Sequence, residues 1–405
     1  MKRLTGSNYD LIVVCLSLFI VTFSVNLEVP LYPVYAADNG KANGFIALIF
    51  SAYVVGLIPV LVLFGGISDY IGKKNTMLIS LFISLISNCL ILIDQTYQML
   101  FVVRILQGIS VAGMLGASAA FILDNIDDLN KSANIQGVLV SVGLGTGALF
   151  TSITIPLTEL DLPLSYYFVA VINLLCIVSM LIIPNEKIIN YGGIVRLPLM
   201  SSNSWVYCFS IFVAWSMVGV IISVAMPIFK SMDAAEYNGL LIFLSISSGA
   251  VFQPLCRDRA PLWALKNGWI ISILSYLLLV IGIVYTSVIL LLIAALLTGI
   301  SSLGFLYIGG LKSVMNDTTE DTAKAVSGYF IYGYLGLGIP CVFVSFITDI
   351  IGVVNAVFLF GLVYFILMII AYFIYWYQKK HVVVCEYHVA INKSKCVNYT
   401  GAKNV

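Results

Sequence analysis

Charged and metal-binding residues are scarce in this sequence. Only 10% of its 405 residues are charged, and the net charge of +1 gives no basis for nucleic-acid binding. The two histidines, His381 and His388, both lie near the C-terminus. The eight cysteines are scattered, mostly in apolar stretches, and no pair has metal-ligand spacing, which argues against a zinc site or a disulfide framework. We therefore expect no metal, cofactor or nucleic-acid partner.

Motifs of catalysis and of ATP hydrolysis are also missing. The sequence contains neither H-E-x-x-H nor G-x-S-x-G, the patterns of zinc proteases and of serine hydrolases. The run Gly72-Lys73-Lys74 lacks the upstream glycine and the hydroxyl of a phosphate-binding loop. We expect a protein that is not an enzyme and does not itself hydrolyse ATP.

Apolar residues, by contrast, make up 61% of the chain, more than a soluble core of this length could bury. A helix needs about 20 apolar residues to cross a bilayer, and twelve stretches qualify. The expected spans are residues 10–36, 43–66, 76–94, 97–124, 134–157, 163–184, 204–228, 237–256, 267–285, 287–312, 325–347 and 350–377. The first run ends in Pro30 and Pro33 without a small-residue cleavage site, so we interpret it as a retained span.

Lysine and arginine gather on one side of this topology. Nearly all of the 20 bases fall in segments that share a side with the N-terminus, whereas the opposite loops hold only Lys41 and Lys230. Because bases concentrate in cytoplasmic loops, we expect both termini to be cytoplasmic. We expect the bilayer to be the plasma (inner) membrane.

The two halves of the chain repeat each other. Leu106–Gly113 in the fourth span matches Leu297–Gly304 in the tenth, 191 positions later. The same offset carries three glycines of the fifth span onto glycines of the eleventh: Gly137, Gly145 and Gly147 onto Gly328, Gly336 and Gly338. At an offset of 184, Gly65, Asp69, Gly72 and Lys73 match Gly249, Gln253, Cys256 and Arg257.

This duplication predicts an all-α integral membrane protein made of two six-helix bundles with a cavity between them. The first bundle covers residues 1–185 and the second covers 204–378. A cytoplasmic linker, 186–203, joins them, and a polar, basic tail follows at 379–405.

Two charged residues, Glu28 and Arg104, lie well inside expected spans. A charge in lipid is costly, so each should face the bundle interior and find a partner. Each lies about seven residues from the same side of the membrane, or ~10 Å deep. One interpretation is a static ion pair that joins two helices. In the other, Glu28 exchanges a proton while Arg104 modulates that exchange or meets the substrate.

A short hydrophilic turn separates the second and third spans, and it contains Gly65, Asp69, Gly72, Lys73 and Lys74. Two lysines after a glycine turn are also ordinary in a cytoplasmic loop. The spacing nevertheless resembles the signature G-x-x-x-D-x-x-G-[RK]-[RK] of the major facilitator superfamily. The run Leu100-x-x-x-Arg104-x-x-Gln107-Gly108 resembles a second signature of that superfamily, in its fourth span. The resemblance covers residue 1 to about residue 378.

The resemblance implies a fold of twelve helices in two pseudo-symmetric bundles and a conformational latch on the cytoplasmic side. Asp69 would lie near the start of the eleventh span, around Thr322–Lys324, where exposed backbone N–H groups favour a carboxylate. Lys73 or Lys74 would pair with a nearby acid, and Asp124 matches the position of the usual partner; Asp124 as a simple helix-end residue is the alternative. The resemblance also associates Arg104 with proton coupling.

By analogy with that superfamily, spans one, four, seven and ten line the cavity, with parts of spans two, five, eight and eleven. Besides Glu28 and Arg104, this nominates Asn26, Tyr53, Trp215, Gln253, Tyr307, Tyr329 and Tyr332. Charge in the first half and aromatic or hydroxyl groups in the second suit an amphipathic or partly aromatic organic molecule. For each Tyr or Trp, interfacial anchoring or helix packing is the alternative.

The fifth span departs from the pattern of drug–proton antiporters, G-x-x-x-G-P-x-x-G-G. The stretch Gly143–Ser152 keeps the glycine spacing, but Ala148 replaces the proline and Thr151-Ser152 replace the last glycines. Our leading expectation is a monomeric, proton-coupled exporter of drug-, metabolite- or siderophore-like compounds. A proton-coupled importer of an organic nutrient, which the altered motif favours, is the alternative. A non-transporting membrane sensor is a third interpretation, because fold does not fix function.

Overall fold

The computed structural model describes residues 8–38, 40, 42–63, 66–126, 128–157, 163–184, 205–257, 259–317, 322–374 and 376. These residues contain twelve helical segments long and apolar enough to cross a membrane, and they form no strand. The predicted all-α membrane class is therefore confirmed. The tail and the linker lie outside the described residues.

The first span consists of three pieces: α1 (Asn8–Val25), the 3-10 turn η1 (Val29–Leu31) and α2 (Tyr32–Asp38). Spans two to nine are α3 (Asn43–Leu63), α5 (Lys73–Ile93), α6 (Tyr97–Ile126), α7 (Leu129–Thr154), α8 (Leu164–Ile182), α9 (Trp205–Ser231), α10 (Asn238–Arg257) and α11 (Pro261–Val284). The tenth joins α12 (Val288–Gly299), the π-helical η4 (Ile300–Leu306) and α13 (Tyr307–Asp317). The last two are α14 (Thr322–Ile351) and Val353–Ile374. The short α4 (Ile67–Ile71) lies between spans two and three.

The expected boundaries agree with the helices to within a few residues at most ends. The largest difference is the ninth span, which begins at Pro261 and not at residue 267. Proline suits the first position of a helix, because its φ is already helical and its missing N–H would be unpaired there anyway. Lys266 therefore lies in the first turns of α11 and not in a loop.

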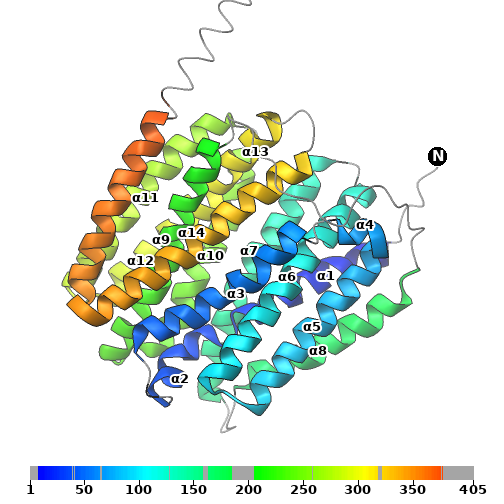
Figure 1. Cartoon of the computed structure of the whole chain (residues 1–405), viewed down its shortest axis with the longest axis horizontal. Coiled ribbons are helices and arrows are strands. Elements are labelled where there is room, and N and C mark those ends of the chain that lie inside the picture. Colours follow the sequence, from blue (N-terminus) through cyan, green and yellow to red (C-terminus); the bar gives the residue numbers. More distant parts are fainter. Residues whose placement is uncertain are drawn as a thin grey trace, which may run out of the picture.

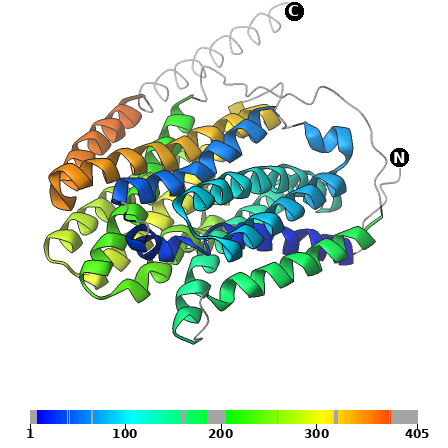
Figure 2. The ribbon, with the colours of Figure 1, turned by 60° about the horizontal axis from the view of Figure 1, so that its bottom comes forward.

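The two six-helix bundles lie side by side (Figures 1 and 2). We call the face at which α1 begins the proximal face, and the face at which α2 ends the distal face. At the seam between the bundles, α3 of the first half packs along α14 of the second, and α7 packs along α10. Spans two, five, eight and eleven thus hold the halves together.

Matching contacts in the two halves confirm the offset of 191 for the fourth and tenth spans. Gly108 lies against the carbonyl of Tyr53, and Gly299 lies against the carbonyl of Leu244. Both members of the second pair are 191 positions after those of the first. Glycine is needed at both places, because a Cβ would collide with the neighbouring backbone.

The same comparison corrects the offset for the fifth and eleventh spans. The Asn26 side chain bonds to the carbonyl of Leu144, and Gly219 lies against the carbonyl of Leu337. These pairs are 193 positions apart, so the offset of 191 is wrong by two residues here. Glycines recur every second residue in both spans, which makes the two registers look alike in sequence.

The match at an offset of 184 is also wrong. Gln253, which it aligns with Asp69, lies inside α10 and is buried, whereas Asp69 lies on α4 in the connection between spans. Because spans two and eight correspond at 191, the counterpart of the turn falls after the end of α10. Gln253 is therefore not the second-half equivalent of Asp69, and its lack of a carboxylate says nothing about the turn.

The altered stretch of the fifth span is a packing surface for both halves. Gly143 and Gly147 face α1, at Phe19 and Phe23, whereas Gly145 faces Ser247 of α10. The replaced glycines make polar contacts instead. Thr151 bonds Ser165 of α8 (Oγ1–Oγ, 2.8 Å), and the Ser152 hydroxyl accepts the N–H of Gly239 (3.0 Å). Ser152 therefore joins the halves at the first turn of α10.

Candidate functional site

The first span is interrupted in its middle, at Asn26–Glu28. Pro30 and Pro33 follow and have no N–H to donate, which favours a break in the regular helix. The last carbonyls of α1 then need partners from elsewhere. Arg104 of α6 supplies one: its Nη1 donates to the carbonyl of Val25 at 2.5 Å. A cation at the C-terminal end of α1 also suits the helix dipole.

Arg104 binds two further groups. Its Nη2 donates to the carbonyl of Phe50 on α3 (3.2 Å), and its Nη1 donates to Gln107 Oε1 (3.1 Å). Three aromatic rings surround the guanidinium, with centroids 5.9 Å (Tyr32), 5.3 Å (Phe50) and 5.5 Å (Tyr53) from its central carbon. The side chain is 1% exposed. Arg104 therefore ties spans one, two and four together inside an aromatic shell.

Glu28 lies beside this guanidinium, as the sequence predicts for a partner. Its Oε1 is 3.5 Å from Arg104 Nη1, and it is equally buried. That oxygen makes no hydrogen bond within the described part of the chain. Arg104 directs Nη1 and Nη2 to carbonyls and to Gln107, and its separation of 3.5 Å from Glu28 Oε1 makes the ion pair a loose one. The Glu28 carboxyl group thus lies beside the guanidinium and Gln107, with Oε1 left without a hydrogen bond.

An aromatic cluster continues from Tyr53 across the seam. Tyr334 of α14 packs edge-on against both Tyr53 (5.9 Å between centroids) and Trp215 of α9 (5.1 Å). The Tyr53 hydroxyl and Trp215 Nε1 are buried, and neither finds a hydrogen-bond partner in the described ranges. Two predicted residues are thus joined by a third, Tyr334, which sequence reasoning missed.

The other predicted cavity residues lie in two further places. Gln253 of α10 donates to the carbonyl of Leu303 (3.1 Å), while its Oε1 has no partner among the described residues. Tyr329 donates to the backbone of the tenth span and packs near Tyr307. Asn26 donates to the carbonyl of Leu144 at 2.8 Å. Tyr332 is only partly buried, at the edge of the core.

The side chains of Tyr53, Trp215 and Tyr334 fill the middle of the seam, where the sequence predicts a cavity. Trp215 and Tyr53 are 8% and 4% exposed and meet through Tyr334. In this conformation the halves are therefore in contact at mid-depth. The buried polar atoms without partners at this place are the groups that an entering solute could satisfy.

The distal face is also closed by contacts between the halves. Asp349 of α14 accepts the N–H of Gly44 at the start of α3 (2.8 Å), and Phe346 packs on Phe45. Two other side chains of the second half reach carbonyls of the first span: Lys230 reaches Pro33 (3.0 Å) and Asn238 reaches Pro30 (3.3 Å).

The hydrophilic turn lies at the proximal face. Its Gly72 has φ +90°, a conformation that residues with a Cβ rarely adopt, which explains a glycine here. Lys73 forms an ion pair with Asp124 at the end of α6, the partner that the resemblance suggests. Lys74 donates to the last carbonyls of α8, at Leu181 (3.1 Å) and Ile183.

Asp69 lies on α4, partly buried. Gly65 lies outside the described residues, and so do the side chains of Thr322–Lys324. The predicted contact between Asp69 and the start of α14 therefore stays a prediction.

Sequence reasoning missed Tyr32, Phe50 and Gln107 around Arg104. Gln107 carried a signal, since it belongs to the same span-four signature. Tyr32 also carried one, because four residues separate it from Glu28 and place both on one helical face. Phe50 contributes its backbone carbonyl, for which no residue type is diagnostic.

Twelve helices able to span a membrane, in two related bundles, are an architecture found among secondary transporters. The chain belongs to the Major Facilitator Superfamily, whose sequence profile matches residues 14–340. It is a transporter of that family and not an enzyme.

Among characterised relatives, it is similar to the Quinolone resistance protein NorA of Staphylococcus aureus, with 21% identity over 257 residues. That alignment covers 61% of this chain and 65% of NorA, so the chain spans about two thirds of the length of this relative. It is also similar to Multidrug resistance protein 1 of Bacillus subtilis, with 28% identity over 173 residues, 42% of this chain and 43% of that protein.

Two solved structures share the fold. The nucleoside transporter NupG (D323A mutant) superposes with a TM-score of 0.71 at 14% identity, over 91% of this chain and all of that one. The human organic anion transporter MFSD10 (TETRAN) superposes with a TM-score of 0.65 at 17% identity, over 90% of this chain and 98% of that one. At these identities the likeness concerns the fold alone.

Proposed function

We propose that this protein exports a small amphipathic, partly aromatic organic solute in exchange for protons, by alternating access of its two halves. The observation that carries the proposal is the buried Glu28–Arg104 pair. It adjoins an aromatic cluster at the seam of the halves, so a proton and a solute act on neighbouring groups. A carboxyl group without a hydrogen bond at Oε1 is free to change its protonation state there.

Export is supported by the relatives, NorA and Multidrug resistance protein 1, whose names describe drug resistance. The neutral aromatic character of Tyr53, Trp215 and Tyr334 supports a substrate with an aromatic part. The distribution of lysine and arginine supports a cytoplasmic proximal face. On this assignment the distal face, closed in this conformation, opens to the outside.

The turn at the proximal face is proposed as the conformational latch. The Lys73–Asp124 pair and the bonds of Lys74 to α8 fix the turn firmly to the first half. Asp69 lies on α4 within this fixed turn, where a group that binds and releases the second half would be required. Its proposed partner is the start of α14, whose backbone N–H groups are unpaired within the helix and would donate to the Asp69 carboxylate.

The experiment is transport of a fluoroquinolone by the purified protein in proteoliposomes, with and without a pH gradient. We expect Glu28→Gln to lower gradient-driven transport by more than about tenfold, the scale of losing a positioned proton-transfer group. Downhill exchange of the labelled drug should continue. Glu236→Gln, an exposed acid on the distal face, is the matched control and should transport normally. Gradient-driven transport at the wild-type rate in Glu28→Gln would refute the coupling role.

Import is the second candidate, and Ala148 in place of the antiporter proline favours it. Reversing the pH gradient in the same vesicles separates the two. An exporter accumulates drug against an opposing proton flow, whereas an importer moves drug and protons in one direction. Drug binding without any movement across the bilayer would instead favour a sensor.

A further inference from the structure

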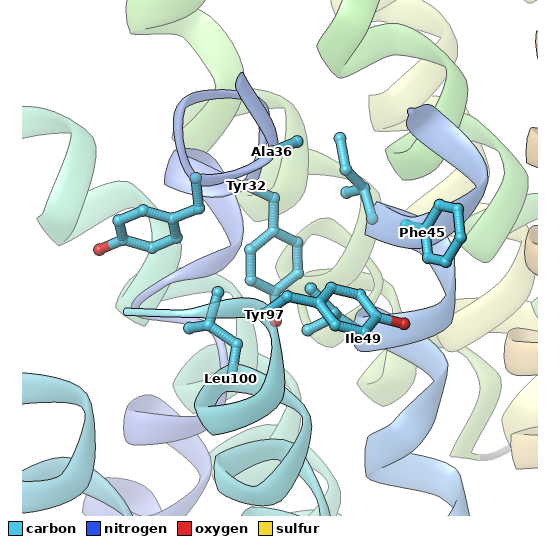
Figure 3. A pocket seen from close by; sticks show the side chains of 8 residues that line it. Tyr32, Ala36, Phe45, Ile49, Tyr97 and Leu100 are labelled. Carbon is cyan, nitrogen blue, oxygen red and sulfur yellow. The ribbon is translucent and has the colours of Figure 1, made fainter. Parts of the chain in front are cut away.

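A narrow pocket opens on the distal face of the first half, beside the seam. It lies between α2, α3 and α6, and it is lined by Tyr32, Tyr35, Ala36, Phe45, Ile46, Ile49, Tyr97 and Leu100. Figure 3 shows the Tyr32 ring at its centre, with Leu100 and Phe45 on opposite sides of it. The pocket's free volume, about 10 Å³, is the size of one water molecule. It is too small for an organic solute.

Tyr32 connects this pocket to the buried carboxyl group. Glu28, Tyr32 and Tyr35 are spaced i, i+4 and i+7 along the outer part of the first span, whose backbone is helical or 3-10 from Glu28 onward. They therefore share one face and climb ~10 Å towards the distal surface. The Tyr32 hydroxyl and Glu28 Oε1 are both buried, and both lack a hydrogen-bond partner among the described residues.

We call Glu28, Tyr32 and Tyr35 the ladder. Its outermost residue, Tyr35, pairs with a tyrosine of α8. The hydroxyls of Tyr35 and Tyr166 of α8 lie 3.0 Å apart. Tyr166 is 1% exposed and lies within electrostatic range of Glu28 and Tyr32. Hydroxyl groups thus extend from the partly exposed Tyr35 inward to the neighbourhood of the carboxyl group.

Gln107 of α6 contacts the Glu28 carboxyl group, and Lys230 of α9 donates to the carbonyl of Pro33, next to Tyr32, at 3.0 Å. Arg104 faces Glu28 from α6 at 3.5 Å, and Tyr53 faces Arg104 from α3. The helices α7 and α10 pack on η1, but their only charged residues, Lys131 and Arg257, lie at the proximal ends. No other charged group on these helices competes for a proton that arrives from the distal pocket.

We propose that the distal pocket and Tyr32 form the route by which protons from the distal side reach Glu28. The inference rests on the proposed function, since it specifies how the coupling carboxylate is loaded. A pocket water that has taken up a proton from the distal solution passes it to the Tyr32 oxygen, as that hydroxyl releases its own proton towards the Glu28 carboxylate, directly or through one further water. One proton enters, one carboxyl group forms, and Tyr32 ends neutral and ready to reorient.

The test follows protonation itself, without a substrate. Full-length protein is inserted in one orientation into proteoliposomes, and the distal side is acidified rapidly. The infrared band of the protonated carboxyl group is assigned to Glu28 by its loss in Glu28→Gln. In Tyr32→Phe the ring and its packing on Arg104 remain, and only the hydroxyl is removed. We expect the band to appear at least about tenfold more slowly in this variant, and to reach a comparable amplitude.

Tyr97→Phe is the matched control, because Tyr97 lines the same pocket from α6 but is not on the ladder. In Tyr97→Phe, Glu28 should become protonated at the wild-type rate. Wild-type loading in Tyr32→Phe, or equal slowing in Tyr97→Phe, would overturn the route while leaving the coupling role of Glu28 intact. If the wild-type protein shows no such band at any pH, Glu28 does not titrate. The proposed coupling then fails together with the route.

Discussion

At the residue scale, Arg104 combines a structural and a functional position. Its guanidinium group presents several N–H donors in one plane, and it uses them on Val25, Phe50 and Gln107. A lysine carries a single compact ammonium group and cannot reach all three acceptors. The arginine is therefore needed to close the broken end of α1, whatever its part in transport.

We expect Arg104→Lys to lower the stability of the protein by on the order of 2 kcal/mol, since hydrogen bonds to charged groups are lost and carbonyls stay unpaired. The measurement is the Tm of the purified protein in detergent. Arg259→Lys is the control, because this exposed arginine also packs on a ring, that of Trp263 at 5.4 Å. Equal Tm values for the two variants would contradict a structural role for Arg104.

The Glu28–Arg104 pair was predictable, because a charge inside a span demands a partner and the two residues lie at similar depth. The acceptors of Arg104 were not. Val25 and Phe50 contribute backbone carbonyls, which every residue possesses, so no side-chain pattern identifies them. Tyr334 was missed for a related reason: its importance comes from touching two rings on other helices.

At the scale of elements, hydropathy predicts where a span lies but not whether it is continuous. Residues 10–36 form one apolar run, yet the helix breaks at Asn26–Glu28. Pro30 and Pro33 were visible signals of that break. The π-helical η4 in the tenth span had no such marker, since its residues pack as an ordinary apolar helix would.

Two helix glycines, one on α7 and one on α6, give predictions of opposite sign at the scale of elements. A Cβ at Gly147 would collide with the Phe23 carbonyl of α1, so we expect Gly147→Ala to cost about 1–3 kcal/mol. Gly116 on α6 has no atom within 4 Å of the corresponding position. There the better helix propensity of alanine should stabilise the protein by up to ~1 kcal/mol. Thermal unfolding measures both, and a stabilised Gly147→Ala would disprove close α1–α7 contact.

At the scale of the whole molecule, the number of spans and the two related bundles followed from the sequence. Lipid imposes long apolar helices, and duplication leaves matching small residues where helices touch. The register of the repeat followed only in part, because glycines two residues apart allow two alignments. The closed distal face could not be predicted, since it depends on how the halves are rotated.

Asp349 is the side chain through which the second half caps a helix of the first. It accepts an N–H at the start of α3, and losing such a cap costs typically ~1 kcal/mol. We therefore expect Asp349→Ala to shift the population towards an open distal face by about fivefold. Spin labels on Gln98→Cys and Tyr285→Cys, exposed on opposite halves in a cysteine-free background, would report the wider separation.

Asp94→Ala is the control for this experiment, because Asp94 caps the start of α6 through Thr96 within the first half alone. It should lower Tm without changing the distance between labels. An unchanged label distance in Asp349→Ala would show that the cap does not hold the halves together.

The broken first span also has a consequence for biogenesis. The carbonyl of Val25 has no hydrogen-bond donor until Arg104 enters the membrane, three spans later in synthesis. Inserting an arginine into lipid costs about 2.5–3.5 kcal/mol, so Arg104 in turn needs acceptors that already stand in place. Each element is therefore unfavourable until the other arrives. A ribosome that stalls before the fourth span leaves an interrupted helix with unpaired polar groups in the bilayer, a recognisable target for membrane quality control.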